Sequence, residues 1–237
     1  LEGIVIREII GDPHSKNKII GTSFCLKLAG AVAVLLMLII AVQASGNTFE
    51  EKFLIMVIGA SVMFQSFNVI DFEFQSQVLS KYVVQANIIA TLISSGLKIY
   101  LILSESPLIH FGIVLFLESA LLAIGLIYYY FKKGHRIKHW RFDRKIARSL
   151  MHDSWPLILS GIVITLYMKI DQIMIKEMLD NDAVGQYAAA VRLSEIWYFI
   201  PVVISNSLFP SIVNSKKVSD QLYYMRLQKL YSLMVLI

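Results

Sequence analysis

Four charged side chains lie deep inside the two apolar runs of the segment 155–210, which a short polar turn separates. Lys169 and Asp171 precede the turn, and Arg192 and Glu195 follow it. Each run is long enough to cross a bilayer as a helix, which takes ~20 apolar residues. A charge deep in hydrocarbon costs at least ~2.5 kcal/mol, so it faces a partner or a wet cavity and marks a candidate functional site.

These charges reach similar depths if the two runs are antiparallel helices. Counted from the turn at 180–182, Asp171 and Arg192 lie at about the same level, roughly 15 Å below the turn at ~1.5 Å per residue. Asp171 can then pair with Arg192, and Lys169 with Glu195. Two interpretations stay open: a static salt bridge that joins two helices, or a functional site.

Three further charged residues are secondary candidates. Asp71 ends a polar series at helical spacing whose other members are Ser61, Gln65 and Asn68. Glu118 lies roughly 15 Å inside another apolar run, and Lys98 is its nearest candidate partner in sequence. A protonated, inert Glu118 and a Lys98 that reaches back to the headgroups remain equally open. The polar series either bonds another helix or lines water.

The composition indicates a polytopic membrane protein. Hydrophobic residues make up 57% and charged residues 16% of the chain, with a mean hydropathy of +0.65, whereas soluble domains are about a quarter charged. The net charge of +5 is concentrated in a few loops, which favours an anionic membrane leaflet over nucleic acid as partner. The single cysteine, Cys25, excludes an intrachain disulfide.

We therefore expect an all-α membrane protein with six complete transmembrane helices and the start of a seventh. The expected spans are 19–42, 53–70, 82–103, 108–131, 155–178 and 184–213, and the seventh begins near 230. Residues 1–18 include isoleucines that favour a short helix on the membrane interface, ended by Asp12 and Pro13.

The loops predict one orientation. The link 132–154 is the most basic stretch, and cytoplasmic links carry an excess of Lys and Arg. Alternation then places three links outside, at 43–52, 104–107 and 180–183, and two more inside, at 71–81 and 213–227. Residues 142–151 can form an amphipathic helix on the inner surface.

Catalytic motifs are missing from the sequence. It has no Gly-rich phosphate loop, no GxSxG and no HExxH, and its histidines lack metal-ligand spacing. We predict that the protein is not an enzyme and that it holds no cofactor and no metal.

Particular stretches resemble a known family. DSWPLILSGIVITLYMKIDQIMI, VGQYAAAVRLSEIWYFIP and NSLFPSI resemble the Wzx-type O-antigen flippases of the multidrug/oligosaccharidyl-lipid/polysaccharide exporter superfamily. The upstream stretches LEGIVIREII, VIDFEFQSQVLSKYV and ISSGLKIYLI resemble the same family. The resemblance covers nearly the whole chain.

The resemblance implies part of a transporter of twelve or more helices, in two lobes around a central cavity. Residues 1–131 would be the remainder of the N-terminal lobe, 132–152 the cytoplasmic linker between lobes, and 153–237 the start of the C-terminal lobe. The implied activity is flipping of an undecaprenyl-diphosphate-linked oligosaccharide, the O-antigen repeat unit, across the bacterial inner membrane. An ion gradient, not ATP, would drive the step. The implied partners are this lipid-linked oligosaccharide, the bilayer and other polysaccharide-assembly membrane proteins.

On this reading Lys169 and Arg192 suit the diphosphate. Asp171 and Glu195 would tune these cations or carry a coupling proton. Three alternatives stay open. One is a drug/cation antiporter of the same superfamily. Another is a membrane-embedded polysaccharide polymerase or ligase, which predicts a large outer loop. The third is a purely structural membrane subunit, which a helix core without charges would have supported.

Overall fold

The computed structural model describes residues 2–44, 46, 48–77, 79–201, 204 and 219–236. Every regular element in these residues is a helix, which confirms the predicted all-α class. The chain forms two compact units, 1–159 and 160–237, and each is considered by itself. Within the described residues, five helical segments are long and apolar enough to cross a membrane. They are Pro13–Ala44, Phe49–Ser76, Lys81–Leu103, Leu108–Lys132 and Arg144–Met178.

The sixth predicted span, 184–213, is described only in part. α8 (Asn181–Glu195) and the 3-10 helix η4 (Ile196–Tyr198) form its first half. Most of its second half lies outside the described residues. The start of the predicted seventh span belongs to α10 (Asp220–Leu236), which begins well before residue 230.

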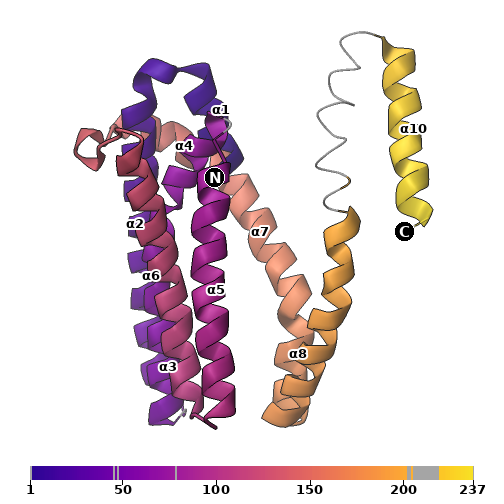
Figure 1. Ribbon diagram of the computed structural model, residues 1–237. Coiled ribbons are helices and arrows are strands. Elements are labelled where there is room, and N and C mark those ends of the chain that lie inside the picture. Colours follow the sequence, from indigo (N-terminus) through magenta and orange to yellow (C-terminus); the bar gives the residue numbers. More distant parts are fainter. Residues whose placement is uncertain are drawn as a thin grey trace. The chain divides into compact units, whose positions relative to one another are not determined.

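Four helices pack along their lengths in the first unit (Figure 1). α6 (Leu108–Lys132) contacts both α3 (Phe49–Ser61) and α5 (Lys81–Leu103), and α3 also contacts α2 (Lys16–Ala44). Small residues lie where α5 and α6 meet: a Cβ built on Gly125 would be 3.0 Å from the Cβ of Ala86. Without a hydrophobic driving force in lipid, such close backbone packing holds the helices together.

The face that α5 buries is made of small residues. Ala86, Ala90 and Ser94 recur every four residues and are 3%, 2% and 1% exposed. Asn87, Thr91 and Ser95 are exposed in this unit. Small side chains bring α6 closer and gain more van der Waals contact than the larger polar ones would allow.

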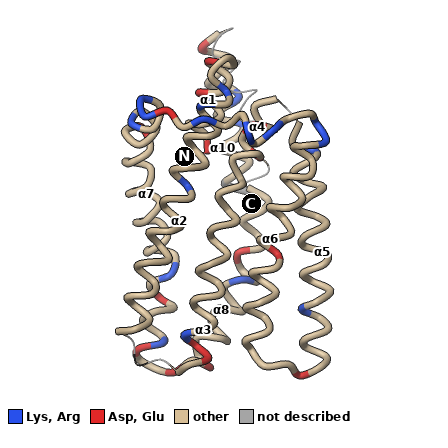
Figure 2. The backbone as a smooth tube through the Cα atoms, turned by 90° about the vertical axis from the view of Figure 1, so that its left-hand side faces the viewer, with Lys and Arg blue, Asp and Glu red and all other residues tan. Residues whose placement is uncertain are grey.

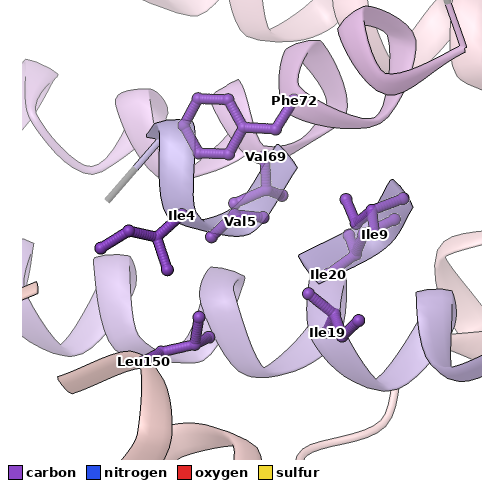
Figure 3. Close-up of a cluster of buried hydrophobic side chains, with 8 residues drawn as sticks. All are labelled: Ile4, Val5, Ile9, Ile19, Ile20, Val69, Phe72 and Leu150. Atoms are coloured by element: carbon purple, nitrogen blue, oxygen red, sulfur yellow. The ribbon is translucent and has the colours of Figure 1, made fainter. Parts of the chain in front are cut away.

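The helix expected near the N-terminus is present as α1 (Glu2–Gly11), but its apolar face packs on protein. Ile4, Val5 and Ile9 are buried in a cluster that also takes residues from α2, α4 and α7 (Figure 3). The other members of this cluster are Ile19, Ile20, Val69, Phe72 and Leu150. The prediction of a helix that rests on the membrane interface is therefore corrected: α1 completes the apolar core at this end of the unit.

The second predicted span is broken rather than one straight helix. α3 ends at Ser61, a 3-10 helix, η2, occupies Phe64–Asn68, and α4 follows at Val69–Ser76. A 3-10 helix turns every three residues instead of every 3.6, so the polar series leading to Asp71 does not stay on one face. Ser61 is buried and Gln65 is exposed. The predicted polar stripe is wrong for this reason.

α4 occupies much of the predicted link 71–81, and its centre is buried. Phe72 is 5% exposed, while Glu73 and Phe74 have no exposed surface. α4 contacts α1, α2, α5 and α6, so this link is part of the core. Lys27 of α2 lies with its Nζ 4.8 Å from the centre of the Phe72 ring. The Lys27 side chain therefore contacts protein.

The basic linker after α6 runs through a short 3-10 helix, η3 (Ile137–His139), and leads into α7 (Arg144–Met178). Asp143 caps α7: its Oδ1 accepts from the backbone N–H of Lys145 at 2.9 Å and of Ile146 at 3.4 Å. The hydrogen bond from Lys145 lowers the pKa of Asp143 the most, and the one from Ile146 lowers it further. Residues 142–151 are thus the beginning of α7 and not a separate surface helix.

Charge is distributed unevenly over the first unit. Figure 2 shows Lys and Arg gathered at the end where α1 and α4 lie. The first turns of α7 at this end are anchored in the core, since Ala147 and Leu150 are 8% and 1% exposed. Tyr130 at the end of α6 is 1% exposed, so it belongs to the core.

Candidate functional site

Asp171 of α7 is held by a tyrosine of α8. The Tyr187 hydroxyl donates a short hydrogen bond to Asp171 Oδ2. The backbone N–H of Gln172 donates to Asp171 Oδ1 at 2.8 Å. Both carboxylate oxygens therefore have a donor, and Asp171 and Tyr187 are each half-buried. Sequence reasoning missed Tyr187, although a tyrosine facing a carboxylate on the neighbouring helix is an ordinary hydrogen-bond partner.

The two pairings that the sequence allows do not form in the described part of the chain: Asp171 forms no ion pair with Arg192, and Lys169 forms none with Glu195. The reason is the position of the turn. α7 continues to Met178 and α8 begins at Asn181, capped by the Asp180 carboxylate on the N–H of Ala183 at 2.8 Å. The turn is therefore centred on 179–180, which brings Asp171 level with 187–188.

This shift changes the surroundings of the predicted cations. Lys169 and Arg192 are exposed, and Glu195 is half-buried. None of the three has an ion-pair partner among the described residues. Asp171 accepts from Tyr187 and forms no ion pair with Arg192. The two cations can therefore attract an anion, and α7 and α8 present them on otherwise apolar stretches.

A second polar group lies between α5 and α6 in the first unit. Glu118 Oε2 is 2.8 Å from Lys98 Nζ and accepts a hydrogen bond of 2.6 Å from Ser94 Oγ. The side chains of Lys98 and Glu118 are 33% and 29% exposed. Lys98, the nearest candidate in sequence, is thus the partner of Glu118. Sequence reasoning missed Ser94, although it lies four positions before Lys98 and shares its helix face.

Asp71, the remaining secondary candidate, lies in α4. Its Oδ1 accepts from Gln75 Nε2 at 3.0 Å, and the same nitrogen donates to Glu2 Oε1 of α1 at 3.0 Å. Gln75 thus bridges two carboxylates that belong to different helices. This arrangement ties α1 to α4 and does not bring Asp71 to the Lys98–Glu118 pair.

The most buried charge of the described residues is one that the sequence did not single out. Glu73 has no exposed surface, and its Oε1 lies 2.6 Å from Lys16 Nζ and 3.6 Å from His135 Nδ1. Gln77 Nε2 donates to the same oxygen at 3.3 Å. Glu73 Oε2 is buried without a hydrogen-bond partner in the described structure. The sequence signal was a carboxylate between two phenylalanines, a setting more typical of a core than of a loop.

Aromatic residues enclose this carboxylate from the linker side. The rings of Tyr130 and His135 stack with centroids 5.0 Å apart, and Trp140 Nε1 donates to the Tyr130 hydroxyl at 2.9 Å. Burial lowers the pKa of His135 from its ordinary 6.5, against the attraction of Glu73. Glu73 and the side chains around it therefore hold the basic linker against α4 and α6. This arrangement is typical of a structural contact and not of a transport site.

The described residues contain no group of three or more His, Cys, Asp or Glu that could hold a metal ion. The polar groups found are ion pairs and hydrogen-bonded carboxylates inside apolar helices. Such groups serve membrane transport or helix packing.

Comparison with known proteins agrees with this picture of apolar helices that carry a few charges. Neither a comparison with curated proteins nor one with solved structures gives a match. Residues 4–216 match a family described as "Polysaccharide biosynthesis protein". The match covers most of the chain, including the five segments able to cross a membrane. The chain therefore belongs to the polysaccharide biosynthesis protein family and is a membrane protein of that family.

Proposed function

We propose that the protein transports a lipid-linked intermediate of polysaccharide synthesis. In this proposal it flips an undecaprenyl-diphosphate-linked oligosaccharide, the O-antigen repeat unit, across the bacterial inner membrane with the aid of an ion gradient. Membership of the polysaccharide biosynthesis family and the five membrane-length segments support a transporter of this kind. A diphosphate and its sugars cannot cross hydrocarbon unaided, because burying unpaired polar and charged groups is too costly.

The observation that carries the proposal is the environment of Arg192. Its guanidinium is exposed and has no ion-pair partner in the described part of the chain, while the nearest predicted partner, Asp171, is occupied by Tyr187. A guanidinium binds phosphate oxygens in a bidentate manner, and Lys169 would add a second cation. An unneutralised cation within an apolar segment is costly in the absence of a ligand, which favours a role in binding an anion.

The experiment is translocation of the lipid-linked oligosaccharide by the complete protein in sealed vesicles. Arg192→Ala should reduce the rate at least about tenfold, and Arg192→Lys should keep part of it, because a point charge still attracts diphosphate but loses the bidentate fork. Lys176→Ala, at an exposed cation in the last turn of α7, is the matched control and should keep the rate. An Arg192→Ala protein that translocates normally would exclude Arg192 as a diphosphate ligand.

The same vesicles distinguish the other candidate activities. A drug/cation antiporter would move a cationic dye against a proton or sodium gradient, and Arg192→Ala would not slow that movement. A polymerase or ligase would lengthen or attach glycan on one side of the membrane without translocation. Collapse of the ion gradient should slow the flipping of oligosaccharide and leave the binding of oligosaccharide unchanged.

A further inference from the structure

The linker between α6 and α7 is fixed to the first turns of α2 by its backbone. The Arg141 N–H donates to the carbonyl of Asn17 at 3.2 Å, and the Asp143 N–H donates to Thr22 Oγ1 at 2.9 Å. The chain passes so close to Gly21 that a Cβ there would lie 2.6 Å from the Arg141 nitrogen. The position of the linker therefore does not depend on the Arg141 side chain.

This docking forms a pocket of about 290 Å³ between the linker and α2. Every lining side chain can donate a hydrogen bond, and none is a carboxylate. The lining residues are His14, Asn17, Lys18, Lys138, His139 and Arg141. A pocket of this size accommodates one small polar group, and its donors favour an anion.

The charge of the pocket is only partly neutralised. Asp143 Oδ2 lies 3.6 Å from Lys18 Nζ, while Asp143 Oδ1 is engaged by the backbone at the start of α7. Lys138 and Arg141 form no ion pair within the described residues. Both side chains are exposed. Two cations on a fixed backbone therefore face the pocket mouth without a protein anion.

The pocket lies at the edge of the apolar region. One wall comes from the start of the membrane-length segment Pro13–Ala44, and the other follows the end of Leu108–Lys132. The ends of membrane-spanning helices lie at the level of the lipid headgroups. An anion available at that level in every membrane is the phosphodiester of an acidic phospholipid.

We propose that this pocket is a binding site for the phosphate headgroup of an anionic phospholipid. The guanidinium of Arg141 can engage two phosphate oxygens, and Lys138 and Lys18 add point charges. This inference concerns the linker and does not depend on which substrate the protein transports. Such a site differs from general attraction between a basic surface and an acidic membrane, because one lipid molecule is retained by one particular pair of cations, Lys138 and Arg141.

The test uses the complete protein in nanodiscs of phosphatidylcholine with about one fifth phosphatidylglycerol. After detergent extraction, native mass spectrometry measures how much phosphatidylglycerol stays bound. Lys138→Gln/Arg141→Gln should reduce the retained lipid at least about tenfold, since both pocket cations are lost. The control Lys132→Gln/Arg136→Gln removes the same charge from residues that do not line the pocket. It should change retention less than about twofold.

Equal losses in the two double variants would overturn the proposal, because attraction would then be a property of the whole basic surface. Inorganic phosphate, added to the protein in pure phosphatidylcholine, tests the other source of the anion. Phosphate retained there through Lys138 and Arg141, with no preference for phosphatidylglycerol over phosphatidylcholine, would also overturn it. Lys18→Gln, on the opposite wall, should weaken retention without touching the linker, and unchanged thermal unfolding of all variants verifies their fold.

Discussion

Glu73 of α4 and Lys16 of α2 form an ion pair of 2.6 Å in which the carboxylate has no exposed surface. The Lys16 side chain is 24% exposed, so it connects the buried charge with the surface. A buried carboxylate is costly unless it is paired and hydrogen-bonded. This pair therefore decides whether α4 can pack where it does, against α1, α2, α5 and α6.

Lys16→Met should destabilise the protein strongly, because it leaves the carboxylate of Glu73 buried without its cation. Removal of one partner of a buried pair costs about 3–5 kcal/mol. The double variant Lys16→Met/Glu73→Leu should regain most of this loss, because no charge is then left uncompensated. Thermal unfolding in detergent, followed by tryptophan fluorescence, measures both. A single variant as stable as the parent protein contradicts the assigned pairing.

The linker should loosen as the pH falls, through His135. Burial lowers the pKa of His135 below 6.5, so protonation opposes its packed position near Glu73, Lys16 and Lys133. The stability that His135 contributes is present above pH 6.5 and is lost as the pH falls through its lowered pKa. The protection of residues 135–141 against hydrogen exchange, taken relative to the intrinsic exchange rate at each pH, should therefore decrease between about pH 7 and about pH 5. His135→Phe keeps the stacking on Tyr130 and should remove this pH dependence; the same dependence in that variant would rule His135 out as its source.

Gly21 is packed so closely against the linker that a side chain at this position should destabilise the protein. Gly21→Ala places a Cβ 2.6 Å from the backbone nitrogen of Arg141, so the linker must move. We expect a loss of about 1–3 kcal/mol, typical of overpacking. A cysteine at position 138 should also react faster with a thiol reagent. Gly30→Ala in the same helix is the control, since nothing lies within 4 Å of a Cβ there. Equal behaviour of the two alanine variants would mean that the linker does not rest on Gly21.

The long apolar runs made the helices predictable. The expected spans 82–103 and 108–131 correspond to Lys81–Leu103 and Leu108–Lys132, because a run of about 20 apolar residues in lipid has only the helix to satisfy its backbone. The partner of Glu118 was also predictable from the sequence, since Lys98 is the nearest cation on the preceding helix.

Side-chain partners were not predictable where they depend on the register between two helices or on the residue at which a helix ends. The difference between Tyr187 and Arg192 as the partner of Asp171 rests on where α7 ends, and helix boundaries are the least certain part of a sequence-based prediction. Glu73 falls in the predicted link 71–81, and although the flanking phenylalanines of DFEFQ suit a core, they do not identify a partner for the carboxylate. Its cation, Lys16, and the imidazole of His135 come from distant parts of the chain.

The Lys98–Glu118 pair should behave as helix packing. Its carboxylate is paired with Lys98 and also accepts a hydrogen bond from Ser94, so its charge is compensated within the protein. Lys98→Met/Glu118→Leu should leave translocation within about twofold of the parent protein, because a well-placed ion pair can often be exchanged for apolar residues. Glu118→Gln alone should reduce the amount of inserted protein more than it reduces the rate per molecule. A tenfold lower rate in the double variant, at normal insertion, would instead assign the pair to transport.

Asp171 should matter through its charge and not only through its bond to Tyr187. Asp171→Asn keeps an oxygen that accepts from the Tyr187 hydroxyl but removes the negative charge that acts on Lys169. If the pair only joins α7 to α8, Asp171→Asn should translocate normally, and Tyr187→Phe should be the more harmful change. We expect the reverse order, because Lys169 has no ion-pair partner in the described residues and the negative charge of Asp171 acts on it. Translocation per inserted molecule decides between the two orders.

Glu177→Gln, at an exposed carboxylate near the end of α7, is the matched control for loss of one negative charge. A normal rate for Asp171→Asn would leave Asp171 and Tyr187 as a structural contact and Arg192 as the site residue to pursue.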